Sequence, residues 1–124
     1  MGLMLLVTAG AASAEWTGVG ENDEIIQYVD LATIRRNGNF VKMWHLMDHK
    51  TVQKDVSYSY LSSKTQSEFD CKEKKRRTLA FTLFGGKMGN GKVVYSDSDA
   101  RGKWSPIEPE SVGETLSKIA CGEK

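Results

Sequence analysis

Residues 104–121 read WSPIEPESVGETLSKIAC, and this stretch decides how the rest of the chain folds. Pro106 and Pro109 fix the backbone φ angle and remove two amide donors, so the chain is expected to enter the stretch in an extended form. Ser111, followed three residues later by Glu114, has the spacing of a capping box at a helix N-terminus. We therefore predict a helix that begins directly after Ser111.

The predicted helix has one apolar stripe and a defined end. Val112, Leu116 and Ile119 recur at helical spacing, which places them on a single face. Cys121 lies at the C-terminal end, and Gly122 behind it can adopt the left-handed conformation that ends many helices. A stripe this narrow covers only part of a sheet face. The remaining sheet surface is expected to be solvated or covered by a second copy of the chain.

The two cysteines of the chain are Cys71 and Cys121. Two cysteines of a small exported protein usually pair, whereas in the cytosol they are more often two buried thiols. If they pair, the bridge ties the terminal helix to the middle of the chain and encloses about 50 residues, which stabilises the fold by about 4 kcal/mol through loop-closure entropy. Neither a CxxC motif nor a Cys/His cluster is present, so the sequence does not favour a redox motif or a structural zinc site.

Residues 1–14 read MGLMLLVTAGAASA and predict export. An apolar core at residues 3–7 precedes the small residues of an A-x-A cleavage pattern, which is typical of a secretory signal peptide. The mature chain is then expected to begin at Glu15. A basic n-region is missing, which indicates a leader that starts upstream of Met1, and the alternative is a buried N-terminal segment. No other stretch approaches the roughly 18 apolar residues of a membrane span.

Residues 15–124 have the size of a single domain, since domains most often contain about 100 to 150 residues. The formal net charge is +1, so the overall charge does not favour a polyanionic partner. The charges are unevenly distributed: residues 1–62 hold five Lys/Arg against seven Asp/Glu, and residues 63–124 hold twelve against nine. The C-terminal half therefore carries the basic surface.

Between the leader and the helix, the sequence reads as strands. Alternating, β-branched and aromatic runs predict about six of them, at residues 16–19, 25–29, 40–47, 56–71, 76–84 and 92–96. Residues 40–47 are apolar on both faces, as expected for a strand in the middle of a sheet. Residues 56–71 are either one long bent strand or two strands joined by a bulge across a polar segment at residues 62–66.

The connections between these strands are short. Asp30 is expected to cap a single helical turn over residues 30–34, and residues 36–39 form a tight turn because Asn and Gly tolerate positive φ. Residues 49–55 and 72–75 read as polar turns, and residues 85–91 as a flexible glycine loop. This pattern predicts an α+β fold, in which a roughly six-stranded antiparallel sheet carries one C-terminal helix on one face.

Several segments occur in the order of a known family. They are Tyr28-Val29-Asp30 with Ile34 and the Asn37-Gly38 turn, Val41-Lys42-Met43-Trp44, Glu68-Phe69-Asp70-Cys71 with Arg77 and Leu79, Met88-Gly89-Asn90-Gly91, Trp104-Ser105-Pro106-Ile107-Glu108-Pro109-Glu110-Ser111, and Ala120-Cys121. Together they resemble the surface-adhesin protein E family of bacterial envelope proteins, over nearly the whole mature chain.

The resemblance implies a six-stranded antiparallel sheet with a C-terminal helix bound by a disulfide, often in a dimer. It also implies adhesion to host extracellular-matrix and serum proteins. The best-known member is similar to a lipoprotein anchored through a cysteine at its cleavage site. Here Ala14 is followed by Glu15 and Trp16, with no lipobox cysteine, so a soluble periplasmic or secreted protein is the more literal prediction.

The densest basic run is the main candidate for binding. Its residues, together with one lysine on the preceding strand, are Lys64, Lys72, Lys74, Lys75, Arg76 and Arg77. They could present an electropositive edge to sulfated glycans or to acidic stretches of matrix proteins. The alternative is that the charges keep a sheet edge soluble. Nucleic acid is not favoured, because no aromatic residues are interleaved within the run.

The sequence offers little for metal or catalytic chemistry. His45 and His49 lie four apart, which in a strand separates them by about 13 Å, so His45 reads as a sheet-face residue and His49 as a turn residue. A Ser57, Ser59, His45 and Asp48 arrangement across adjacent strands is open, but no spacing requires it. We therefore expect no cofactor, no metal and no enzymatic activity.

Trp44 and Trp104 are expected to lie in the core.

Two functions remain. The first is an exported, non-catalytic envelope binding protein that uses exposed strands, loops and the basic run, with a homodimer across the uncovered sheet face as a further prediction. The second is a periplasmic structural or small-ligand-binding protein without an adhesive role. A deep apolar pocket under residues 85–91 would favour the second function.

Overall fold

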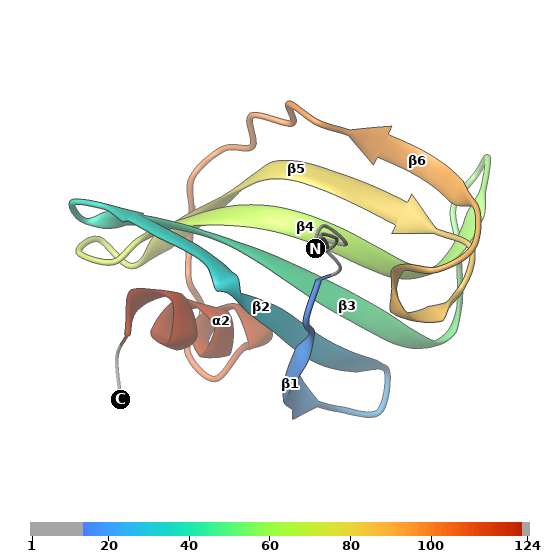
Figure 1. Ribbon diagram of the computed structural model, residues 1–124, viewed down its shortest axis with the longest axis horizontal. Coiled ribbons are helices and arrows are strands. Elements are labelled where there is room, and N and C mark those ends of the chain that lie inside the picture. The colour runs from blue at the N-terminus through green and yellow to red at the C-terminus, as the bar shows by residue number, and fades with distance from the viewer. Residues whose placement is uncertain (1–13, 123–124) are drawn as a thin grey trace, which may run out of the picture.

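The computed structural model describes residues 14–122, so residues 1–13 of the predicted leader lie outside the described part. The elements in chain order are β1 (Thr17–Glu21), β2 (Ile25–Asn37), β3 (Phe40–Lys54), β4 (Ser59–Asp70), β5 (Lys75–Phe84), η1 (Lys87–Gly89), β6 (Val93–Asp97), β7 (Ser105–Pro106) and α2 (Val112–Cys121). Figure 1 shows a twisted sheet with α2 at one end of it.

The predicted antiparallel sheet with one C-terminal helix is confirmed. Strands β1 to β6 lie side by side in sequence order, and each is antiparallel to the next. The short strand β7 pairs with β5 through Ser105 and Pro106. Because every long strand pairs with its sequence neighbour, short turns are enough to connect them. No helix within residues 14–122 is long and apolar enough to cross a membrane.

The core lies between α2 and one face of the sheet. Val29, Val41, Met43 and Phe69 from three strands pack with Leu116 and Ala120 from the helix, as one buried cluster. Alternate residues of a strand point to opposite faces. The odd-numbered residues of β3 from Val41 to Met43 therefore face α2, and their even-numbered neighbours face away.

The helix ends are as predicted. The Ser111 side chain accepts a hydrogen bond from the Glu114 amide at 3.2 Å, and Gly122 ends the helix with a φ of 75°. Glu114 completes the cap in a variant form, since its Oε1 accepts from the Glu110 amide rather than from the Ser111 amide. Both helix termini thus have partners for backbone groups that the helix itself leaves unpaired.

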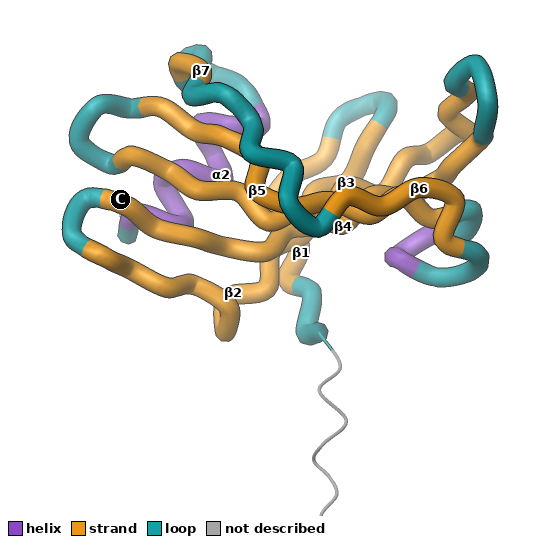
Figure 2. Tube along the Cα trace, turned by 90° about the horizontal axis from the view of Figure 1, so that it is seen from above, coloured by secondary structure: helices purple, strands orange, loops and turns teal. Residues whose placement is uncertain are grey.

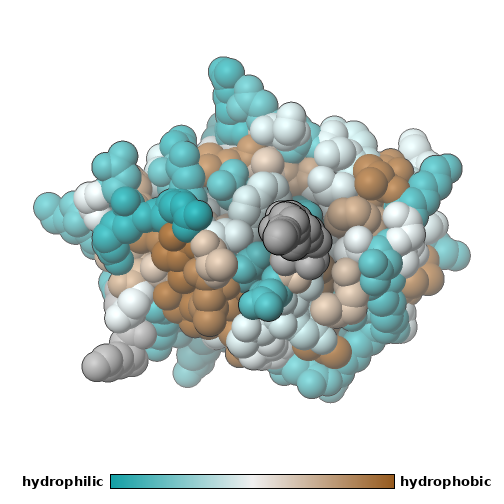
Figure 3. Space-filling view, in the orientation of Figure 1, coloured by the Kyte–Doolittle hydropathy of each residue, from teal (hydrophilic) through white to brown (hydrophobic). Residues whose placement is uncertain are grey.

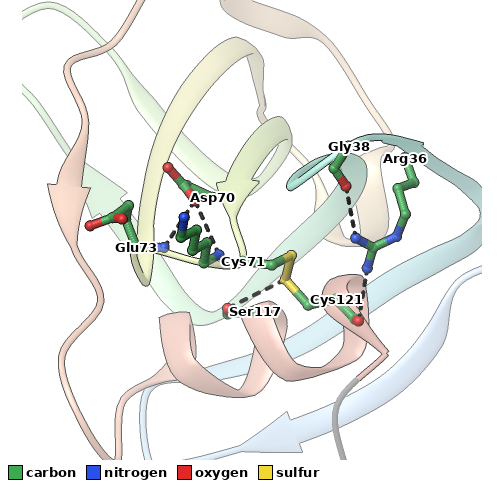
Figure 4. The surroundings of a disulfide bond; sticks show 8 residues. Arg36, Gly38, Asp70, Cys71, Glu73, Ser117 and Cys121 are labelled. Atoms are coloured by element: carbon green, nitrogen blue, oxygen red, sulfur yellow. Dashed lines mark hydrogen bonds between the residues drawn. A yellow bond between two sulfur atoms is a disulfide. The ribbon is translucent and has the colours of Figure 1, made fainter.

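The disulfide between Cys71 and Cys121 is present, with 5.8 Å between the Cα atoms and a sequence separation of 50. It joins the end of β4 to the last turn of α2 (Figure 4). Beside it, Arg36 Nη2 donates to the Cys121 carbonyl at 2.9 Å, so β2 also holds the helix C-terminus. The sequence left open whether the two cysteines pair. The structure shows that they do, and the bridge connects the helix to the sheet.

The predicted helical turn over residues 30–34 is wrong, because β2 continues to Asn37 with an irregularity in its pairing between Asp30 and Arg35. Side chains satisfy the backbone groups that the irregularity exposes. Asp30 Oδ1 accepts from the Ala32 amide at 3.2 Å, and the Thr33 hydroxyl donates to the Asp30 carbonyl and accepts from the Trp44 amide. This is a β-bulge, in which polar side chains replace the missing ladder bonds.

The segments on both sides of the β3–β4 connection also differ from the prediction. Strand β3 runs on to Lys54, so His49 is a buried strand residue instead of a turn residue. Val56 lies in the turn and is 99% exposed. Strand β4 is one strand, and the polar segment at residues 62–66 belongs to it because its backbone pairs with both β3 and β5.

The loop around η1 covers the sheet face opposite α2, at the other end of the sheet (Figure 2). The Met88 amide donates to Asp48 Oδ1 at 2.9 Å, and the Gly89 amide donates to the Ser62 hydroxyl at 2.9 Å. Gly89 has a φ of 70° and a Cβ there would lie 3.3 Å from Leu46, so the loop packs directly on the sheet. Among residues 14–122, α2 thus covers one face of the sheet at one end, and the η1 loop covers the other face at the opposite end.

On the side of the molecule seen in Figure 3, the largest area of apolar surface lies where β2 crosses α2, and smaller areas lie toward the other end of the sheet. Leu31 of β2 is 52% exposed.

Candidate functional site

No helix or loop of the described residues covers the sheet face opposite α2 at the end that carries the β2–β3 and β4–β5 turns, and we call this surface the open face. Cross-strand pairing places Arg35 opposite Lys42, Lys42 opposite Glu68, and Glu68 opposite Arg77. Four charged side chains thus form a row across four strands, on the side facing away from the helix. The open face consists of Arg35, Phe40, Lys42, Trp44, Lys64, Glu68, Lys75, Arg77 and Trp104.

Cations lie over aromatic rings on the open face. The Arg77 guanidinium is 4.6 Å from the Trp104 ring centroid, and Lys64 Nζ is 5.8 Å from that of Trp44. Phe40 packs on Trp104 with 5.7 Å between ring centroids. Contacts at these distances are favourable cation–π and aromatic interactions.

The prediction that Trp44 and Trp104 are core residues is therefore wrong. Both are half-buried, and they lie on the open face instead of under α2. Trp44 follows Met43 in β3, and Met43 points into the core, so the alternation of the strand turns Trp44 to the opposite side.

The carboxylates near the open face already have partners. Glu68 Oε1 accepts from Arg77 at 2.7 Å and is largely buried beneath it. Asp70 Oδ1 accepts from the Lys72 and Glu73 amides at 3.1 and 2.9 Å, which orders the β4–β5 turn. The ammonium groups of Lys42 and Lys75 lie on the same face and are exposed. The open face therefore offers an excess of positive charge around aromatic rings.

The structure divides the predicted basic residues among three places. Lys64, Lys75 and Arg77 are on the open face, while Lys72 and Lys74 are exposed in the turn after β4. Arg76 points to the opposite face, because it pairs directly with the core residue Phe69. The six residues thus do not form one patch.

Two further cations, Arg35 and Lys42, complete the open face and were missed by sequence reasoning. Lys42 lies between Phe40 and Trp44 at a spacing of two, which is the signal that could have placed all three on one face. Arg35 follows the β2 bulge. The bulge shifts the alternation of side chains, so that the face occupied by Asp30 before it is occupied by Arg35 after it. No feature of the sequence alone indicates that shift.

His45 lies on the helix side of the sheet and is buried. Its Nε2 and the Ser67 hydroxyl are 2.8 Å apart, and its Nδ1 has no hydrogen-bond partner among residues 14–122. Burial, with a smaller contribution from the charge of Arg76, lowers the pKa of His45 from 6.5 to about 4. His45 is therefore neutral at pH 7.

The neutral state of His45 predicts a pH-dependent stability. The folded protein does not take up the proton that the unfolded chain binds below pH 6.5, so the free energy of unfolding falls as the pH drops from about 6.5 to about 4. Over that range the loss due to His45 amounts to roughly 3 kcal/mol at most. Burial also lowers the pKa of His49, which adds a loss of the same sign. Urea unfolding of the wild type and of His45→Gln at several pH values separates the contributions of His45 and His49. An equal dependence of the unfolding free energy on pH in both proteins would contradict the role of His45.

The sequence left open a catalytic group of Ser, His and Asp side chains, but these side chains do not come together. Asp48 lies on the sheet face opposite His45 and binds the Met88 amide, and Ser57 is in the turn before β4. The hydroxyl next to His45 belongs to Ser67. Within the described residues, no group of three or more His, Cys, Asp or Glu side chains could hold a metal ion.

A family model described as surface-adhesin protein E matches residues 16–122 of this chain. No curated protein matches this chain.

The fold is similar to that of solved structures of protein E from Haemophilus influenzae. Crystal form II of that protein has a TM-score of 0.57 at 11% identity, with 84% of this chain and 91% of the other covered. The selenomethionine form has a TM-score of 0.56 at 10% identity, with 89% and 95% covered. The structure from non-typeable Haemophilus influenzae has a TM-score of 0.58 at 11% identity, with 92% and 81% covered. At these identities the likeness concerns the fold alone.

Proposed function

The chain belongs to the surface-adhesin protein E family, and we propose that it is an exported, non-catalytic envelope protein that binds extracellular-matrix or serum proteins, or sulfated glycans, through the open face. The observation that carries the proposal is the pairing of the half-buried cations Lys64 and Arg77 with aromatic rings, on a sheet surface that nothing else in the described chain covers. Trp and Arg dominate the binding energy of many protein interfaces, and clustered cations attract acidic partners.

The chemistry of the open face favours an acidic or sulfated partner. Glu68 uses only part of the hydrogen-bonding capacity of Arg77, because a guanidinium carries five N–H groups. Lys42, Lys64 and Lys75 add ammonium groups around the two indole rings. Nucleic acid is not part of the proposal, because the overall charge of the chain is only +1.

Paired lysine variants test the open face. We expect Lys42→Ser combined with Lys64→Ser to weaken retention on immobilised heparin and on purified matrix and serum proteins by about tenfold or more, equal to at least ~1.4 kcal/mol. The matched control is Lys54→Ser with Lys92→Ser, which removes two exposed lysines from elsewhere and should retain binding. Equal losses in both double variants would show a dependence on net charge only, and no loss in the first would remove the open face from the proposal.

Export is the second part of the proposal. Residues 1–14 are proposed to act as a signal peptide, and residues 15–124 to form the mature domain in the periplasm or outside the cell. A disulfide between Cys71 and Cys121 supports this, since such bridges persist in oxidising compartments. Fractionation of producing cells, with mass spectrometry of the mature N-terminus, checks both the compartment and the start at Glu15.

A periplasmic structural or small-ligand-binding role remains the alternative proposal. Its criterion was a deep apolar pocket under residues 85–91, whereas Gly89 there packs closely on Leu46 and Phe84. A homodimer across the open face is a related proposal, because it would use the same aromatic and cationic side chains. Sedimentation measurements with the Lys42→Ser and Lys64→Ser double variant would detect it as a change in the monomer–dimer equilibrium.

A further inference from the structure

A cleft of about 460 Å³ lies on the helix side of the sheet, away from the open face. Its floor is formed by β3, β4 and β5, and its rim by the segment that runs along β5 toward β7. The Gly102 amide donates to the Thr78 carbonyl at 2.8 Å, and a Cβ at Gly102 would lie 2.9 Å from that carbonyl, so only glycine allows the rim to approach so closely. We call this the Arg76 cleft.

Arg76 lines this cleft, and its guanidinium has no neutralising partner among residues 14–122. Its guanidinium packs against Gly113 in the first turn of α2, at 3.1 Å from the position that a Cβ there would take. It makes no hydrogen bond or ion pair with any residue in the described part of the chain. The N-terminal end of a helix carries partial positive charge, which adds to the unfavourable environment of a half-buried cation. Burial lowers the pKa of Arg76 accordingly.

The rest of the lining is also suited to an anion. Residues that line the cleft include the hydroxyl side chains of Thr65, Ser67 and Thr78 and the cation Lys103, but no Asp or Glu. His45 lines it as well and is neutral at pH 7. Arg77, also on the lining, is already bound to Glu68. The charge that Arg76 brings therefore has no counter-ion in the part of the chain that the structure describes, and it is available to a ligand.

We propose that the Arg76 cleft binds a single carboxylate group, with the Arg76 fork as its bidentate partner and Lys103 and the hydroxyl groups around it. A planar two-oxygen anion matches one guanidinium. A polysulfated chain instead requires a row of cations, and that arrangement occurs on the open face. The carboxylate belongs either to a small organic acid or to an acidic side chain of a partner protein. The inference goes beyond the proposed function and does not depend on it, because Arg76 and the open-face residue Arg77 point to opposite faces of the sheet.

The test is an NMR titration of ¹⁵N-labelled protein with sodium acetate, with an acetylated Asp-containing peptide and with sodium methyl sulfate, at constant ionic strength set by sodium chloride. Carboxylate binding should shift the amides of Gly102, Gly113 and Thr78 in a saturable manner. Saturation by acetate and by the peptide with similar affinity indicates a small-acid site. Saturation by the peptide at much lower concentration indicates a protein partner.

Arg76→Gln should lose this binding by about tenfold or more, and Lys75→Gln, which removes the neighbouring cation from the other face, should leave it unchanged. Arg76→Met keeps an unbranched apolar stem without the charge, and it should bind no carboxylate while melting at least as high as the wild type. Unchanged binding in Arg76→Gln, no saturable shift with either carboxylate probe, or tighter binding of methyl sulfate than of both would each overturn the proposal.

Discussion

Replacement of both Cys71 and Cys121 by serine is expected to lower the free energy of unfolding by about 4 kcal/mol. The bridge closes a loop of 50 residues, so its removal returns a large part of the chain's conformational freedom to the unfolded state. It also removes the covalent link between the sheet and α2, whose buried residues are Gly113, Leu116, Ser117 and Ala120. Many small domains are stable by only about 5 to 15 kcal/mol, so the loss is a large share of the total.

Urea unfolding of the double serine variant and of the wild type, each with and without reductant, measures this effect. Reductant should move the wild type toward the variant and should not change the variant. A loss below about 1 kcal/mol would contradict the view that the bridge holds the two layers together.

Phe69→Ala is expected to cost about 4 kcal/mol, because it leaves a cavity in the middle of the core. Phe69 is fully buried between the sheet and α2, among Val41, Met43 and Leu116. The matched control is Phe40→Ala, which removes the same side chain from the open face, where Phe40 is 41% exposed. That variant should lose no more than about 1 kcal/mol.

Chemical denaturation of the two phenylalanine variants gives the comparison directly. Similar losses in both would mean that the open face is packed as tightly as the helix side. That result would contradict the assignment of the core to one face, and with it the assignment of Phe40 to a binding surface.

The closing stretch of the chain was the most predictable part of the fold. The Ser111 cap, the Gly122 end and the position of Leu116 on the buried side all follow from local spacing, and local hydrogen bonds and side-chain periodicity decide them. The cysteine pairing was open at that stage, because it depends on the compartment as well as on distance. The order of the strands was predictable for the same local reason, since each pairs with its neighbour in sequence.

The irregular parts of the sheet could not be predicted in this way. At residues 30–34 a run that begins with Asp reads as a capped helical turn, but its hydrogen bonds go to a bulge in β2. At residues 62–66 the sequence left open one bent strand or two strands joined by a bulge, and pairing with strands on both sides keeps these residues within the single strand β4. In both places the long-range ladder outweighs local preference.

The candidate site was predictable only in part. The basic run was visible, but the sequence could not show that Arg76 faces away from Arg77 and Lys75, or that Trp104 reaches the open face from beyond β6. Trp44 was placed in the core because large aromatic residues are usually buried. The structure turns it toward solvent beneath Lys64. A surface of this kind is therefore found from strand register more readily than from composition.

Hydroxyl-radical footprinting of the protein with and without bound heparin tests the central claim, that the open face is the binding surface. The account predicts that binding protects Phe40, Trp44 and Trp104. Tyr95, which is exposed on β6 near the other end of the sheet, should be labelled equally in both states. Protection of Tyr95 with unchanged labelling of the two tryptophans would contradict it.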